Sequence, residues 1–222
     1  MTLRETLLLP VVLAAGTFVF VAVALDGVGE AKGDGAFATA FLMLVAAAAC
    51  GPFTFASAPG APPWSPLRQG ALAGLAFALC GALACGAIRP QEFAAGAAAG
   101  ALAGPFAFAL GAVAYAAGGG IARAAVAAVG LALLATLFYW DGLFLFHAAD
   151  RKASAALAFG ISPAAAASVT AGFDWIHSEV LYRNNQTAES LVAVPLEGAG
   201  AMATKLLGIG GGAGALGLLR KP

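Results

Sequence analysis

Charged residues are scarce in this chain of 222 residues, at 10% of the sequence, whereas hydrophobic residues make up 61%. A soluble domain carries about a quarter charged residues and about half apolar ones. A soluble fold of this length could not remove so much apolar surface from water, because its ratio of area to volume leaves much of that surface exposed. The composition therefore excludes an ordinary soluble domain and favours a protein that lies in a lipid bilayer.

The chain also lacks an excess of basic charge, paired cysteines and histidine clusters. Its 11 Lys and Arg balance 11 Asp and Glu without a basic stripe, so nucleic-acid binding has no electrostatic support. Cys50, Cys80 and Cys85 lie in apolar stretches without CxxC spacing, so we expect buried thiols and no metal site or disulfide. The two histidines, His147 and His177, cannot supply two bis-histidine haem sites.

Long apolar runs are what the sequence has in abundance. A helix needs about 20 apolar residues to cross roughly 30 Å of hydrocarbon. The runs predict an all-α, polytopic transmembrane helix bundle with six or seven spans. The first is interpreted as a retained span, because it exceeds a signal-peptide core and no clean cleavage site follows it. The expected spans are 7–25, 36–58, 70–88, 93–117, 121–146 and 199–219, with 153–172 as an ambiguous seventh.

Proline and glycine mark where these runs should end. Pro52 is expected to kink or terminate the second run. Four prolines in 59–69 predict a loop, with Trp64 at the level of the lipid headgroups. Residues 89–92 form a predicted turn, and three consecutive glycines break the chain at 118–120.

The chain is expected to have three parts. Residues 1–152 form a five-span bundle. Residues 153–198 combine an apolar segment, interrupted by Pro163, with a polar amphipathic segment outside the membrane. The apolar segment is interpreted as a span, a re-entrant segment or an interfacial one. Residues 199–222 form the last span and a basic C-terminus.

Orientation follows from the distribution of Lys and Arg. Seven spans place the N-terminus outside, and six place it inside. Both interpretations put 173–198 outside and the C-terminus in the cytoplasm. The bias towards Ala and Gly suggests a GC-rich bacterial genome, so we expect the bacterial inner membrane.

Glycines at four-residue spacing mark helix faces that pack closely in lipid. The alternative is that helices rich in Ala and Gly match this spacing by chance. The pattern leaves open whether the neighbouring helix belongs to this chain or to another subunit. The candidate packing residues are Gly70, Gly74, Gly96, Gly100, Gly104, Gly208 and Gly212.

Ionisable side chains inside a span are candidates for function because they are costly there. Asp141 is interpreted as a proton or ion ligand or a contact to a partner, or else as an acid that reaches headgroup water beside an aromatic belt. Lys205 is expected either to snorkel to the interface or to form a salt bridge with Asp141.

The polar segment 173–198 predicts an amphipathic helix on the outer membrane surface. Its aromatic and charged side chains suit a docking surface for a partner, and the alternative is a solvated connector. The candidate docking residues are Trp175, His177, Tyr182 and Arg183.

Three functional hypotheses follow from these features. The first is a non-catalytic membrane subunit of a larger complex, with other membrane protein subunits and lipid as partners. The second is a small transporter or permease component that uses Asp141 and the interrupted helices. The third is a membrane-embedded enzyme acting on lipid, although no motif of known spacing supports it; its candidates are His147, Asp150, Asp174 and His177. The sequence identifies no cofactor and leaves bound lipid as the candidate ligand.

Overall fold

The structure is a computed structural model that describes residues 8, 11–12, 15–16, 19, 34–55, 62–88, 90–144, 159–173 and 196–219. Within these ranges every regular element is a helix, which confirms the all-α class. Among the described residues four helical stretches are long and apolar enough to cross a membrane, and the six or seven spans expected for the whole chain stay a prediction. They are Gly35–Phe53, Ser65–Ile88, Pro90–Ala117 and Ala199–Leu219.

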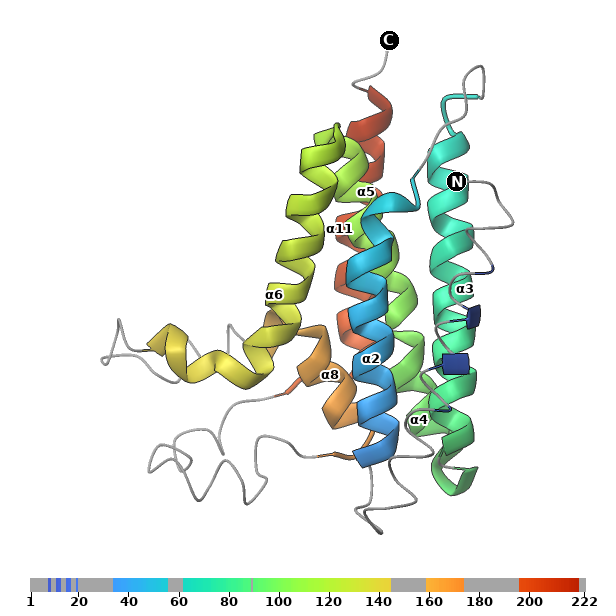
Figure 1. The fold of residues 1–222 in the computed structure, drawn as a ribbon, viewed down its shortest axis with the longest axis vertical. Helices are drawn as coiled ribbons and strands as arrows, with labels where there is room; N and C mark the ends of the chain where they lie inside the picture. Colours follow the sequence, from blue (N-terminus) through green and yellow to red (C-terminus); the bar gives the residue numbers. More distant parts are fainter. Residues whose placement is uncertain are drawn as a thin grey trace.

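The long helices alternate in direction along the bundle (Figure 1). The start of α3, the turn between α5 and α6 and the end of α11 lie together at what we call the upper end. The starts of α2, α4 and α11 lie at the lower end. The elements are α2 (Asp34–Cys50), η1 (Gly51–Phe53), α3 (Ser65–Ile88), η2 (Pro90–Glu92), α4 (Phe93–Ala101), α5 (Ala103–Ala117), α6 (Gly120–Phe144), α8 (Pro163–Thr170) and α11 (Ala199–Leu219).

Proline and glycine set several of these boundaries. The α-helical part of α2 ends at Cys50, directly before Gly51 and Pro52, which begin the 3-10 turn η1. Gly118 and Gly119 have φ values of 74° and 81°, a conformation that favours glycine, and they separate α5 from α6.

The start of α3 corrects the predicted loop over 59–69. The helix begins at Ser65, so the last five residues of that range are helical. Pro66 lies in the first turn, where the missing N–H would have had no partner within the helix in any case. The prolines therefore limit the loop and do not prevent the helix from starting.

The fourth expected span is divided into α4 and α5 at Leu102. Pro105 explains the division, because it has no N–H for the Ala101 carbonyl and its ring crowds that carbonyl. The Leu102 N–H instead bonds to the Ala99 carbonyl at 3.3 Å, in a tighter turn.

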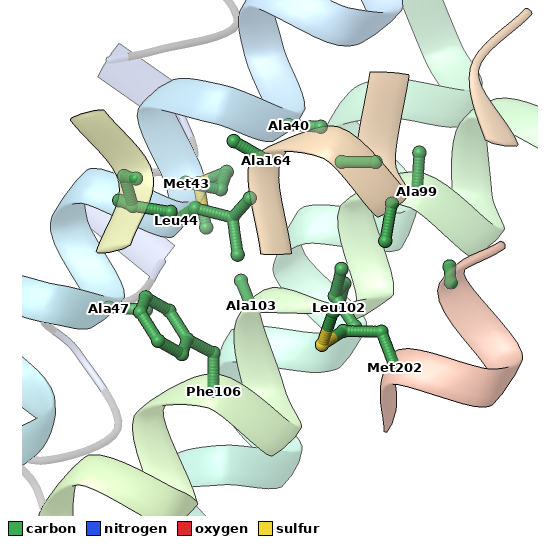
Figure 2. Packing of buried hydrophobic residues seen from close by; sticks show 14 of the residues in the cluster. Ala40, Met43, Leu44, Ala47, Ala99, Leu102, Ala103, Phe106, Ala164 and Met202 are labelled. Atoms are coloured by element: carbon green, nitrogen blue, oxygen red, sulfur yellow. The ribbon is translucent and has the colours of Figure 1, made fainter. Parts of the chain in front are cut away.

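Small apolar residues fill the core between α2, the α4–α5 pair, α8 and α11 (Figure 2). The alanines allow these helices to approach closely, and larger side chains such as Met43 and Phe106 fill the remaining space. The same core includes Met202 of α11, so α11 packs in one bundle with the earlier helices. The proposed division of the chain into three parts stays a prediction.

Glycines bring α3 against α4 and α5 almost backbone to backbone. A Cβ atom added at Gly100 would press on the Gly81 carbonyl and lie 2.6 Å from the Cys85 sulfur. One added at Gly96 would lie 2.7 Å from the Cys85 carbonyl. Gly104 faces Gly74 in the same way. The neighbour of the Gly96, Gly100 and Gly104 face is therefore helix α3 of this same chain.

The remaining predicted glycine positions lie elsewhere. Gly70 packs against the ring of Phe55 and not against a helix. Gly208 and Gly212 have nothing within 4 Å of an added Cβ, so they make no close packing contact with the described part of the chain. The face of α11 that packs on α5 and the start of α3 instead carries Gly210, Gly214 and Gly217.

The segment 153–172 is described from residue 159, and there it holds the eight-residue helix α8. Eight residues extend about 12 Å, too short to cross a bilayer. The end of α8 lies at the lower end, where the Phe173 ring stacks on Phe37 of α2 at 5.1 Å. In the seven-span interpretation, the start of α3 and the end of α11 lie on opposite sides of the membrane. In the structure both lie at the upper end of the bundle, which contradicts that interpretation.

The glycine contact between α3 and α4 yields a stability prediction. We expect Gly100→Ala to lower the free energy of unfolding by about 1–3 kcal/mol, because the added methyl overpacks a backbone contact. Gly212→Ala, the matched control, has open space at its Cβ and should leave stability unchanged or slightly raised. Denaturation in detergent, followed by circular dichroism, measures both, and equal stability of the two variants would contradict the contact.

Candidate functional site

The most unusual part of the bundle is the short helix α8, which is buried at the lower end of the bundle. Residues 162–168 are all buried, and α8 packs against α2, α4, α6 and α11. Irregular backbone is tolerated at membrane depth only where protein or a water-filled cavity surrounds it. The polar groups of this segment therefore need partners within the bundle.

At the start of α8 the hydroxyl group of Ser162 forms hydrogen bonds with backbone atoms. Its backbone is extended, with φ −89° and ψ 112°, as the following Pro163 favours. The Ser162 hydroxyl donates to the Leu133 carbonyl of α6 at 3.2 Å and accepts the Ala165 N–H at 3.4 Å. One side chain therefore caps α8 and joins it to α6.

Thr170, the last residue of α8, also forms hydrogen bonds with backbone atoms through its hydroxyl group. Its hydroxyl donates to the Ala166 carbonyl at 2.8 Å and accepts the backbone N–H of Ala199, the first residue of α11, at 2.8 Å. The first N–H groups of a helix have no partner within the helix. Thr170 therefore caps α11 from a distance of 29 residues in sequence.

Lys205 connects α11 with two other segments at the same end. Its ammonium lies 2.6 Å from Glu197 Oε2 and donates to the Gly160 carbonyl at 3.4 Å. Helical side chains lean towards the N-terminus of their helix, so Lys205 extends down towards the lower end. Both side chains are partly exposed, at 49% and 38%, so the ion pair is solvent-screened and contributes modestly.

The partner of Lys205 among the described side chains is therefore Glu197. The structure describes Asp141 only as part of the backbone of α6, so its predicted pairing with Lys205 stays a prediction. The candidate docking residues Trp175, His177, Tyr182 and Arg183 lie outside the described residues. So do the enzyme candidates His147, Asp150 and Asp174.

The buried hydroxyls at this site bind backbone atoms. The Ser168 hydroxyl, like those of Ser162 and Thr170, donates to a carbonyl, at 2.8 Å from that of Ala165. Among the described residues no group of three or more His, Cys, Asp or Glu side chains could hold a metal ion. The arrangement is suited to holding the short helix α8 in place.

Ser162 and Glu197 were not predicted from the sequence, although each carries a signal. Serine followed by proline is a typical start of a helix, with Ser as the cap and Pro in the first turn. Glu197 lies two residues before α11 and eight before Lys205. Its pairing with Lys205 depends on how the chain enters α11, which spacing alone does not indicate.

The role of Ser162 can be tested by removing its hydroxyl. We expect Ser162→Ala to lower the free energy of unfolding by about 1 kcal/mol or more, because both the cap of α8 and the bond to α6 are lost. The control is Thr204→Ala, whose hydroxyl bonds only to Gly200 within its own exposed helix turn and should matter by less than about 0.5 kcal/mol. Thermal unfolding in detergent that shows similar losses for both would argue against Ser162 as a joint.

Comparisons with protein-family models, with curated proteins and with solved structures found no match to this chain.

Proposed function

We propose that this chain is a non-catalytic integral membrane subunit that packs against a transmembrane helix of another subunit through α11. The observation that carries the proposal is the pair Gly208 and Gly212, four residues apart, exposed and with open space beside each. Small residues at this spacing let two helices approach closely in lipid.

Among the described helices, α11 packs on the bundle through a different set of glycines from Gly208 and Gly212. Gly210 and Gly217 lie against the rings of Phe108 and Tyr115 of α5, at 2.7 Å and 2.5 Å from an added Cβ. Only 28% of the membrane-length window of α11 is buried, against 67% for the window of Pro90–Ala117. Much of α11 is therefore available to a neighbour.

Helix α3 offers a contrast within the same bundle. Its outer face carries Leu75, Leu79 and Leu83, which are 56%, 56% and 63% exposed. A row of large aliphatic side chains fits directly into the acyl chains of a bilayer. Glycines in the corresponding position leave the backbone open and gain little from contact with lipid, so they favour a close protein neighbour.

The same proposal includes the bacterial inner membrane, with the upper end in the cytoplasm. Over the whole chain the count of Lys and Arg is near even between the two ends, so the support is the group of basic residues at the upper end. Arg68 and Arg123 lie in the helices that start at the upper end, and the sequence continues from the end of α11 into two further basic residues. The lower end, with 173–198, is then outside. These basic residues are Arg68, Arg123, Arg220 and Lys221.

The packing of α11 on a partner can be tested with bulky substitutions. We expect Gly208→Leu and Gly212→Leu to release this chain from its native complex, because each places a large side chain at the contact. The matched control is Ala128→Leu, which adds a similar side chain on the exposed face of α6. Native gel electrophoresis after mild extraction measures the assembly. Intact complexes in both glycine variants, or a purely monomeric wild-type protein, would refute the proposal.

A transport component is the second candidate function, and α8 is the observation that favours it. Broken helices that end within a bundle form the substrate sites of several transporter folds. In this candidate Asp141, in the lower part of α6, is the ion-binding residue. Solute or proton flux into liposomes that contain only this chain, lost on Asp141→Asn, is the expected result, and liposomes without flux would remove the candidate.

A further inference from the structure

An apolar groove runs along the outside of the bundle between α3, α5 and α11. Its volume is about 260 Å³, larger than the 150 Å³ engineered cavity that accommodates benzene. Every side chain in its wall is apolar. The residues that shape it are Ala71, Gly74 and Leu75 of α3, Gly104 and Pro105 of α5, and Leu207 of α11.

The groove follows from the way in which α3 and α11 pack on α5. The two outer helices approach each other near the upper end, where an added Cβ at Gly214 would lie 2.6 Å from Leu67 Cδ1. Below this contact the floor includes Gly74 and Gly104, whose backbones pack directly on each other. The groove is open to the perimeter of the bundle, because Leu75 and Leu207 at its edges are exposed.

Arg68 of α3 and Trp64, the residue directly before α3, lie above the groove on the same side of the helix. Positions 64, 68, 71 and 75 follow the spacing of one helix face. Arg68 lies about 10 Å above Leu75 along the helix axis, and its guanidinium carbon is 6.0 Å from the centre of the Trp64 ring. Tryptophan favours the headgroup level, and a guanidinium binds phosphate with two parallel hydrogen bonds.

The basic residues at the upper end of the bundle also favour the binding of an anion there. Glu92 at the start of α4 and Glu197 before α11 both belong to the lower end, whereas Arg68 and Arg123 belong to the upper end. In the part of the chain that the structure describes, no acidic side chain pairs with Arg68. A negative headgroup at Arg68 would gain about 1 kcal/mol from one basic residue at the membrane surface, which is about fivefold in affinity.

From these observations we propose that the groove is a binding site for one anionic phospholipid. The phosphate group binds Arg68 beside Trp64, and one acyl chain lies along Ala71 and Leu75 over the glycine floor. The apolar wall fits a hydrocarbon chain because it offers no hydrogen-bonding group that the chain would leave unpaired. This site lies on the α3 side of α11 and does not depend on the subunit contact proposed for Gly208 and Gly212.

The test compares phosphatidylglycerol with phosphatidylcholine of the same acyl chains, added to the delipidated full-length protein in detergent. Native mass spectrometry counts the bound lipids. We expect the wild-type protein to bind one phosphatidylglycerol tightly and phosphatidylcholine about fivefold more weakly. Arg68→Gln should weaken phosphatidylglycerol binding about fivefold, to the level of phosphatidylcholine. Ala71→Phe, which fills the groove from its exposed rim, should weaken both lipids.

Two control variants separate the site from general effects. Arg123→Gln removes a basic residue elsewhere at the upper end, and Leu79→Phe enlarges an exposed side chain of α3 outside the groove. Both should bind phosphatidylglycerol like the wild-type protein. Equal losses in Arg68→Gln and Arg123→Gln would show attraction by overall charge and overturn the site. Release of a protein partner by Ala71→Phe, with lipid binding unchanged, would overturn it as well.

Discussion

The contact between α3 and the α4–α5 pair is the constraint on which the rest of the bundle depends. In lipid, burying apolar side chains gives helices little reason to associate, so close packing and hydrogen bonds must hold them together. At Gly81 and Gly100 the two backbones approach with no side chain between them. This contact brings α5 to the centre of the bundle, with α3 on one of its sides and α11 on another.

The positions of the outer helices follow from this arrangement. Because α3 and α11 both pack on α5, they leave a groove between them that is lined in part by Gly74 and Gly104. Helix α8 fills the lower end, and its hydroxyl groups replace the backbone partners that a continuous helix would have provided. The long helices therefore pack through small residues, whereas the short helix α8 is held by hydrogen bonds from serine and threonine.

Much of this fold could be predicted from the sequence, because hydrophobic length is a strong signal. The last helix begins and ends where the apolar run does, at Ala199 and Leu219. Pro52 ends the α-helical part of α2 as expected. Two predictions failed because the effect of a proline depends on its position within the helix. Pro66 lies in a first turn, where it is tolerated, and the effect of Pro105 in dividing a span was missed.

The site was less predictable, because it depends on which face of a helix is turned inward. In α11 two sets of glycines have the four-residue spacing, and only Gly210 and Gly214 face the bundle. Spacing cannot distinguish the two faces. Gly81 was overlooked for a related reason, since it lies seven residues from Gly74 and five from Gly86 and not at four-residue spacing. The hydrogen bond from Ala199 to Thr170 joins residues that no local pattern connects.

The contact between α11 and α5 has a consequence for how the protein is made. A chain is synthesised from its N-terminus, and early parts can pack before later ones exist. Helix α5 is synthesised long before α11, so the rings of Phe108 and Tyr115 can pack against Gly210 and Gly217 only later. The first backbone N–H of α11 donates a hydrogen bond to Thr170 of α8. Among the described elements, α8 directly precedes α11 in the sequence. The face of α5 that carries these two rings is therefore covered by α11 only after the later part of the chain has been made.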